Sequence, residues 1–258
     1  MPFAPVTAIE FPPVSHVIEW PDLFLSGPFA VNKVVLLMWI SAILVFAFFF
    51  AASRRQSLVP AGVQNLAESV VDFIREGVIL QTMGPEGLPW TPFLLMLFSF
   101  IFVCNIWEVI PGVQMPVNAR IALPVLMTLL IWVIFNFIGI KRQGFFGYFK
   151  SMMFPPGVPW PIYILVAPIE LISTLLVRPL SLSVRLFANM LAGHLILVTF
   201  AVITASLVDA SPLIVIWPFS FLLLVGLTGF EVLVAVLQAF IFTILAGVYI
   251  GGAMHPEH

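Results

Sequence analysis

The chain has 258 residues, of which 62% are hydrophobic and only 9% are charged, and its formal net charge is -2. Soluble domains carry about 25% charged residues, so this composition excludes a soluble protein, and without a basic tract it gives no sign of nucleic-acid binding. Apolar runs of about 20 residues without strand-like alternation predict an all-α polytopic membrane protein. The single cysteine, Cys104, excludes an internal disulfide.

Three spans and one amphipathic helix are predicted in the first half of the chain. The spans cover residues 31–52, 90–110 and 121–140. Residues 61–80 repeat apolar side chains at helical spacing and carry polar ones on the other side. This pattern predicts an amphipathic helix on the membrane surface or against a partner. A tight turn containing Pro111-Gly112 and Pro116 is expected between the second and third spans.

The second half is predicted to be an interfacial loop followed by a long helical hairpin. Residues 143–161 mix aromatic, basic and proline residues, which is typical of an interfacial loop. The apolar stretch 162–208 fits either two ordinary spans or one long, strongly tilted helix. Two spans would place Arg178 and Arg185 outside, against the positive-inside rule, so we favour one helix. A last helix starts at residue 213.

The basic clusters predict the orientation of a single membrane domain, residues 1–258, with about five crossings. The pairs Arg54-Arg55 and Lys141-Arg142 should face the cytoplasm. The N-terminal segment 1–29 then lies outside, the C-terminus lies inside, and residues 162–252 form a tilted hairpin.

An arginine interrupts the long apolar stretch. Arg185 stands in the run RPLSLSVRLFANMLAGH, which begins at Arg178, and mostly apolar residues continue as far as Val208. A guanidinium keeps its charge in proteins, and placing it at a bilayer centre costs at least about 2.5–3.5 kcal/mol. Such a charge faces a partner, a water-filled cavity or an ion path. The sequence therefore predicts ion conduction or ion-coupled work.

The last helix carries one polar stripe. Glu231, Gln238 and Tyr249 are seven and eleven residues apart, which returns them to nearly the same helix face. Each either bonds a neighbouring helix for structure alone or takes part in ion movement. His194 and Glu231 lie at similar helical rise from the turn near Ser211, so they could face each other in the hairpin. Both residue types exchange protons when their surroundings tune them.

Further polar residues mark the long helix and the second span. Four are predicted within about a quarter turn of one another in an α-helix: Glu170, Arg178, Ser181 and Arg185. Asn189 extends this face by one turn, whereas His194 lies about half a turn from Arg185. Arg178 either belongs to the site or reaches the inner headgroups by snorkelling. Glu108 is either an interfacial salt-bridge partner or part of an outer vestibule.

This pattern resembles subunit a, the proton-channel stator subunit of rotary (F-type) ATP synthases. The most specific matches are the segment from Arg178 to His194, and Glu231 followed by the run 237–242 and Tyr249. Asn105 with Pro111 adds a weaker match. Many bacterial relatives carry the His194 and Glu231 residue types in exchanged order, glycine is common at Ala188, and the spacing from Glu170 to Arg178 is one residue longer than usual.

The resemblance implies two aqueous half-channels that open to opposite sides, with Arg185 between them. The outer one would be lined by His194, Glu231, Asn189 and Gln238, and the inner one by Glu170, Ser173, Ser181 and Tyr249. The implied partners are a ring of carboxylate-bearing c subunits, the peripheral-stalk subunit b, the soluble ATPase head and the lipid bilayer. The resemblance implies no catalysis by this chain alone and no cofactor or metal, and we expect a bacterial plasma membrane.

Two other protein classes fit the sequence less well. A proton-coupled secondary transporter also keeps buried ionisable groups, but it usually contains an internal repeat or paired broken helices, and the sequence shows neither. An intramembrane zinc enzyme is disfavoured because no His-Glu-x-x-His motif occurs and the histidines are scattered along the chain.

Overall fold

The computed structural model describes residues 31–54, 61–154, 160–209 and 213–254. The predicted outer segment 1–29 and the tail 255–258 lie outside these ranges. Five helical stretches in the described part are long and apolar enough to cross a membrane: Lys33–Arg54, Pro85–Ile106, Ala122–Gln143, Tyr163–Val208 and Ile214–Met254. The prediction of an all-α polytopic membrane protein is confirmed.

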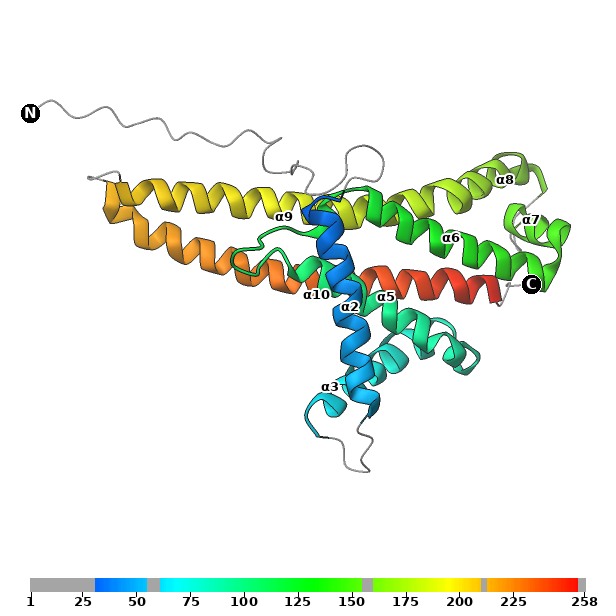
Figure 1. Cartoon of the computed structure of the whole chain (residues 1–258). Coiled ribbons are helices and arrows are strands. Elements are labelled where there is room, and N and C mark those ends of the chain that lie inside the picture. The colour runs from blue at the N-terminus through cyan, green and yellow to red at the C-terminus, as the bar shows by residue number, and fades with distance from the viewer. Residues whose placement is uncertain (1–30, 55–60, 155–159, 210–212, 255–258) are drawn as a thin grey trace, which may run out of the picture.

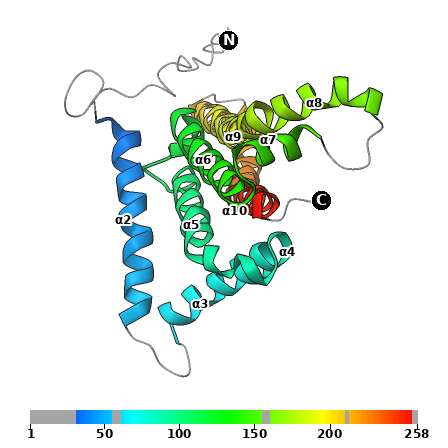
Figure 2. The ribbon, with the colours of Figure 1, turned by 90° about the vertical axis from the view of Figure 1, so that its right-hand side faces the viewer.

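A long antiparallel hairpin dominates the fold. Its arms are α9 (Arg178–Asp209) and α10 (Trp217–Met254), with η6 (Leu213–Ile216) before the second arm. In Figure 1 the two arms run side by side, and α2 (Lys33–Arg54) passes in front of them in this view at a steep angle. Figure 2 shows the hairpin nearly end-on while α2 stands upright. The hairpin is therefore steeply inclined to α2, as predicted for a strongly tilted pair.

The first arm begins as α8 (Tyr163–Ile172) and passes through a π-helical turn, η5 (Ser173–Val177), into α9. Together with α9 this makes one helical stretch of 46 residues, which confirms one long helix rather than two spans. A π turn closes its hydrogen bonds one residue later than an α turn. The helical-wheel positions predicted for residues 170–185 assumed a continuous α-helix. The π-helical turn changes these positions.

The amphipathic segment is only partly a surface helix. It comprises α3 (Val63–Ile74), the π-helical turn η1 (Arg75–Ile79) and α4 (Leu80–Thr82), followed by η2 (Pro85–Trp90). The apolar side chains of Val63 and Leu66 are exposed, whereas Ile74, Val78 and Ile79 are fully buried. The first half thus offers an apolar face to the membrane or to a partner, and the second half belongs to the core.

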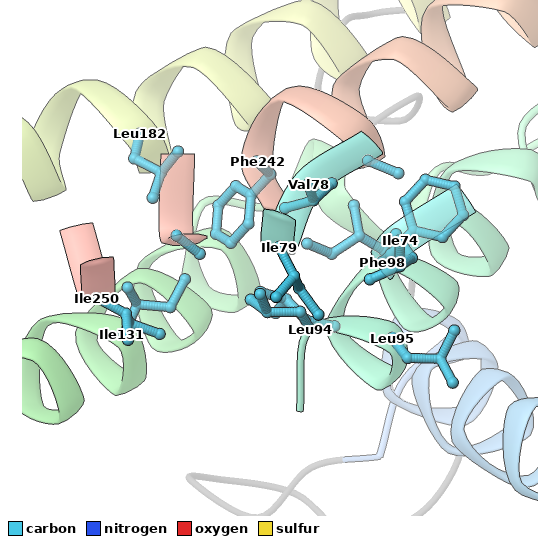
Figure 3. Packing of buried hydrophobic residues seen from close by; sticks show 14 of the residues in the cluster. Ile74, Val78, Ile79, Leu94, Leu95, Phe98, Ile131, Leu182, Phe242 and Ile250 are labelled. Carbon is cyan, nitrogen blue, oxygen red and sulfur yellow. The ribbon is translucent and has the colours of Figure 1, made fainter. Parts of the chain in front are cut away.

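That core joins the amphipathic segment to α5 (Thr91–Ile106), α6 (Ala122–Gln143) and α10 (Figure 3). Helices in lipid gain little from the hydrophobic effect against one another, so close contact between small residues matters. A methyl group added at Gly251 of α10 would lie 2.5 Å from the carbonyl oxygen of Thr82. The end of α10 therefore rests directly on the amphipathic segment.

The basic ends of the helices gather on one surface. Arg142, at the end of α6, donates a hydrogen bond to the Met254 carbonyl at the end of α10, 3.0 Å away. It also lies 3.9 Å from Glu86 of η2. Arg54 ends α2, whose last turn borders α3. The amphipathic segment, the ends of α2 and α6, and the end of α10 therefore share one side of the protein.

The segment predicted as an interfacial loop contains a helix, so that expectation was incomplete. Gly144, with φ 75°, ends α6, and α7 (Phe145–Met153) follows. Phe145 and Phe146 are exposed, while Tyr148 is buried. The prolines that suggested a loop begin only at residue 155. Two short helices complete the described elements: η3 (Val117–Ala119) and η4 (Trp160–Ile162).

Candidate functional site

The two arms of the hairpin keep a constant register relative to each other along the part that carries the polar residues. The hydroxyl oxygens of Thr204 in α9 and Ser220 in α10 are 2.7 Å apart. Three turns further along each arm, the carboxyl group of Glu231 lies over the backbone of Gly193. Both contacts are buried. The equal depth of position 194 and Glu231, predicted by counting residues from the turn, is therefore present in the structure.

Glu231 and His194 occupy neighbouring positions inside the hairpin. Each side chain is only 6% exposed. Glu231 fits because Gly193 has no side chain, since a Cβ there would lie 2.5–2.6 Å from the Glu231 carboxyl atoms. One carboxyl oxygen, Oε2, has no hydrogen-bond partner among the described residues. A buried carboxyl group with a spare oxygen is suited to exchanging a proton with a neighbouring group or water.

A cavity of about 130 Å³ lies beside this pair. Its polar lining comes from four residues: Glu108, Gln114, His194 and Thr228. This is room for a few water molecules, since one occupies about 30 Å³ in the liquid. His194 and Glu108 therefore share one polar space between the α5–α6 connection and the hairpin.

Glu108 is a buried acid at this cavity, just beyond the end of α5. It is 4% exposed, and its Oε1 has no hydrogen-bond partner among the described residues. Burial raises the pKa of Glu108 from 4.5 to about 8, and the nearby Glu231 charge adds to the increase. This placement favours the vestibule interpretation over an interfacial salt bridge. With a pKa of about 8, the Glu108 carboxyl group changes its charge close to neutral pH.

An amide network links η3, α5 and α10. Asn118 of η3 donates a hydrogen bond to Asn105 Oδ1 at 2.7 Å, and Asn105 donates to the Ala235 carbonyl at 3.3 Å. Gln238, one turn beyond Ala235, is 6% exposed. Glu231 and Gln238, which the sequence predicts to share one face of α10, are both buried.

Arg185 lies on a different face of α9 from the buried cluster. It is exposed, as are four neighbours at helical spacing: Ser181, Ala188, Asn189 and Ala192. Among the described residues, no carboxylate lies within ion-pair distance of Arg185. Asn189 shares this face and does not join His194 and Glu231. The small side chains around Arg185 let another helix approach closely.

A second polar group lies beyond Arg185, towards α8. Arg178 and Glu170 form an ion pair at 3.8 Å across the π-helical turn, and Ser173 in that turn is half-buried. Tyr249 of α10 is half-buried, with its ring 5.9 Å from the Phe135 ring of α6. The structure thus brings Glu170 and Arg178 together and places Tyr249 on the neighbouring arm.

Sequence reasoning missed several polar residues at these two groups. Gln114 and Thr228 line the cavity, Asn118 bonds to Asn105, and Tyr148 is buried near Arg178. Thr228 could have been found, because it precedes Glu231 by three residues and so shares its helix face. Gln114 and Asn118 lie in the connection between α5 and α6, where no long periodicity marks them, and Tyr148 lies in the short helix α7, whose sequence suggested a loop.

The fold and site define an all-α membrane protein that carries an exposed arginine and, behind it, a buried acid–base cluster within a tilted hairpin. The profile of the family described as ATP synthase A chain matches residues 35–251. This chain belongs to that family.

Curated relatives cover nearly the whole chain. It is 42% identical over 252 residues to ATP synthase subunit a of Frankia alni, which covers 95% of this chain and 87% of that protein. The subunit of Rhodococcus erythropolis is 40% identical, with coverage of 90% and 86%. That of Hyphomonas neptunium is 38% identical, with coverage of 97% and 98%.

Proposed function

We propose that this chain is the proton-translocating subunit a of a rotary ATP synthase, not catalytic alone, and that it couples a proton gradient to ATP synthesis or hydrolysis. The observation that carries the proposal is Arg185, an exposed guanidinium in an apolar helix that has no carboxylate partner among the described residues. A charge held in this way needs a counter-charge from another subunit. The family relationship supports the same conclusion.

The counter-charge is a carboxylate on a ring of c subunits that turns past the exposed face of α9. Arg185 stabilises the ionised form of each carboxylate as it arrives. Once reprotonated, the neutral carboxyl group can move into lipid without the cost of burying a charge. The small residues Ala188 and Ala192 allow the ring helix to pass close to Arg185.

Protons reach the ring through the buried cluster. The cavity at Glu108 and His194 forms the outer vestibule, and Glu231 passes the proton along the hairpin. Gln238 continues the stripe on α10, and Asn189 leads to the ring because it shares the face of Arg185. Among these groups, acids and an imidazole can hold the proton, while the amides orient water and their neighbours.

Protons leave on the other side through the group around the π-helical turn. Glu170, Arg178, Ser173, Ser181 and Tyr249 provide the polar lining of this inner path. Arg185 lies between the two groups along the hairpin, so its fixed positive charge opposes direct passage of protons from one to the other. A potential of 100 mV contributes about 2.3 kcal/mol for each charge that crosses.

The side of the protein where the basic ends of α2 and α6 lie faces the cytoplasm of a bacterial cell. Arg142, Arg54 and the end of α10 lie on this side, so the C-terminus is inside and the N-terminus outside. Subunit b and the soluble head complete the complex. The exposed apolar half of α3 lies on this side and offers a surface to lipid or to such a subunit.

The proposal is tested by replacing Arg185 in the assembled complex and measuring ATP-driven acidification of inside-out vesicles. Arg185→Ala should abolish pumping while the chain still inserts and assembles. Arg185→Lys should pump little or not at all, because a point ammonium lacks the extended planar guanidinium. Full pumping by the alanine variant would refute the mechanism. Near-normal pumping by the lysine variant would remove the argument for a guanidinium-specific barrier.

A further inference from the structure

The π-helical turn between α8 and α9 contains a backbone carbonyl that the helix itself leaves without an α-helical donor. In this turn the amide of Arg178 donates to the Ser173 carbonyl, five residues earlier. Pro179 comes next and has no amide hydrogen. The carbonyl of Leu175, four residues before Pro179, would accept that missing hydrogen in a regular α-helix. It therefore needs a donor from elsewhere.

Trp132 of α6 supplies the donor. Its indole Nε1–H donates to the Leu175 carbonyl at 3.0 Å from a half-buried position. An unsatisfied backbone group in a bilayer is unfavourable because no water is available to bond it. The bond from α6 thus replaces one that Pro179 removes from the helix. It links α6 to the π-helical turn at the Leu175 carbonyl.

Two further hydrogen bonds connect the Trp132 backbone to α7. Asn136, one turn further, donates to the Trp132 carbonyl at 2.7 Å. Tyr148 of α7 in turn donates its hydroxyl to Asn136 Oδ1 at 3.1 Å. A Cβ at Gly139 would collide with the Tyr148 ring, so the ring packs directly against α6 there. The brace, consisting of Trp132, Asn136 and Tyr148, connects α6, α7 and the π-helical turn.

The other end of the brace lies near the charged pair of the inner group. Burial raises the pKa of Tyr148 to about 12, and the nearby positive charge of Arg178 opposes the increase. Arg178 pairs with Glu170 across the same turn. The brace therefore contacts the π-helical turn at Leu175 and approaches Arg178.

We propose that Trp132 is a positioning residue for the inner proton path, because its indole N–H holds the π-helical turn in place of the amide that Pro179 lacks. The turn sets the rotation of the segment carrying Glu170 relative to the helix carrying Arg185. This inference rests on the proposed function, since the rotation matters only if both residues serve one proton path. Asn136 and Tyr148 act through Trp132.

The test is a double-mutant cycle between Trp132→Phe and Pro179→Ala in the assembled complex, where coupling is the readout. Phenylalanine keeps the ring but has no donor, and alanine restores a backbone donor for the Leu175 carbonyl. The measurement is the labelling rate of a cysteine introduced by Ser173→Cys, with vesicle pumping measured in parallel. Trp132→Phe should change the labelling rate by about fivefold or more when Pro179 is present. In the Pro179→Ala background its effect should fall below about twofold.

Trp107→Phe is the matched control. Its indole also donates a hydrogen bond, but to the Ser41 hydroxyl at 2.7 Å, far along the chain from the turn. Its effect should be the same in both backgrounds. Equal effects of Trp132→Phe with and without Pro179 would overturn the inference. The labelling rate does not depend on proton flow. Pumping by Arg185→Ala would therefore refute the proposed function without changing the labelling result.

Discussion

Gly193 is predicted to be essential for proton transfer although it carries no functional group. A Cβ added there would lie 2.5 Å from Glu231 Oε2 and 2.6 Å from Cδ and Oε1. Ordinary contacts of a Cβ begin at 3.4 Å. In Gly193→Ala the Glu231 carboxyl group must therefore move by about 1 Å, a displacement that can cost about 100-fold in a positioned reaction.

The same substitution should hardly change folding or assembly. The carboxyl group ends a flexible side chain, so moving it costs about 0.5–1.5 kcal/mol in rotamer energy. Alanine in place of glycine inside a helix gains about 0.5–1 kcal/mol. The two contributions oppose each other and are of similar size. The variant therefore tests the position of the Glu231 carboxyl group with little change in the stability of the hairpin.

Proton transfer depends on that position, because it needs a donor and an acceptor about 2.6–3.2 Å apart. ATP-driven acidification of vesicles by Gly193→Ala should fall about 10- to 100-fold, while the amount of assembled complex stays near the wild-type value. Gly252→Ala is the control, since a Cβ there meets nothing within 4 Å. Wild-type pumping by an assembled Gly193→Ala complex would refute the proposed placement of Glu231 in the path.

Three further results are expected. Cysteines placed at Glu68 and Asp72, which are exposed on α3, should label from the cytoplasmic side with impermeant reagents in a background without the native cysteine; labelling only from outside would reverse the assigned orientation. The double exchange His194→Glu with Glu231→His should pump better than either single exchange, because each single exchange places two like groups in the site; simple additivity would show that the two do not act as a pair. Glu108, whose pKa is raised to about 8, binds a proton below that pH and loses it above. Glu108→Gln should slow pumping at neutral pH and remove the change in rate near an outer pH of 8, and an unchanged pH profile would exclude Glu108 from the path.

The sequence by itself determined the helices and the residues that bear charge within them. Apolar runs of membrane-spanning length, with Arg185 as the exception, are local properties of the chain. Counting along the hairpin was enough to place His194 and Glu231 at equal depth, because an α-helix rises by a fixed amount per residue. The prediction that Glu231 and Gln238 share one helix face rests on the same regularity.

Only the tertiary structure decided which groups meet across different helices. It brought Glu108 near Glu231, placed Tyr148 near Arg178, and paired Trp132 with the carbonyl that Pro179 leaves without an α-helical donor. It also formed α7 in a segment whose composition suggested a loop. These contacts join segments with no common periodicity. They depend on how closely whole helices approach, and the shape of the packed side chains, rather than the local pattern of residues, sets that distance.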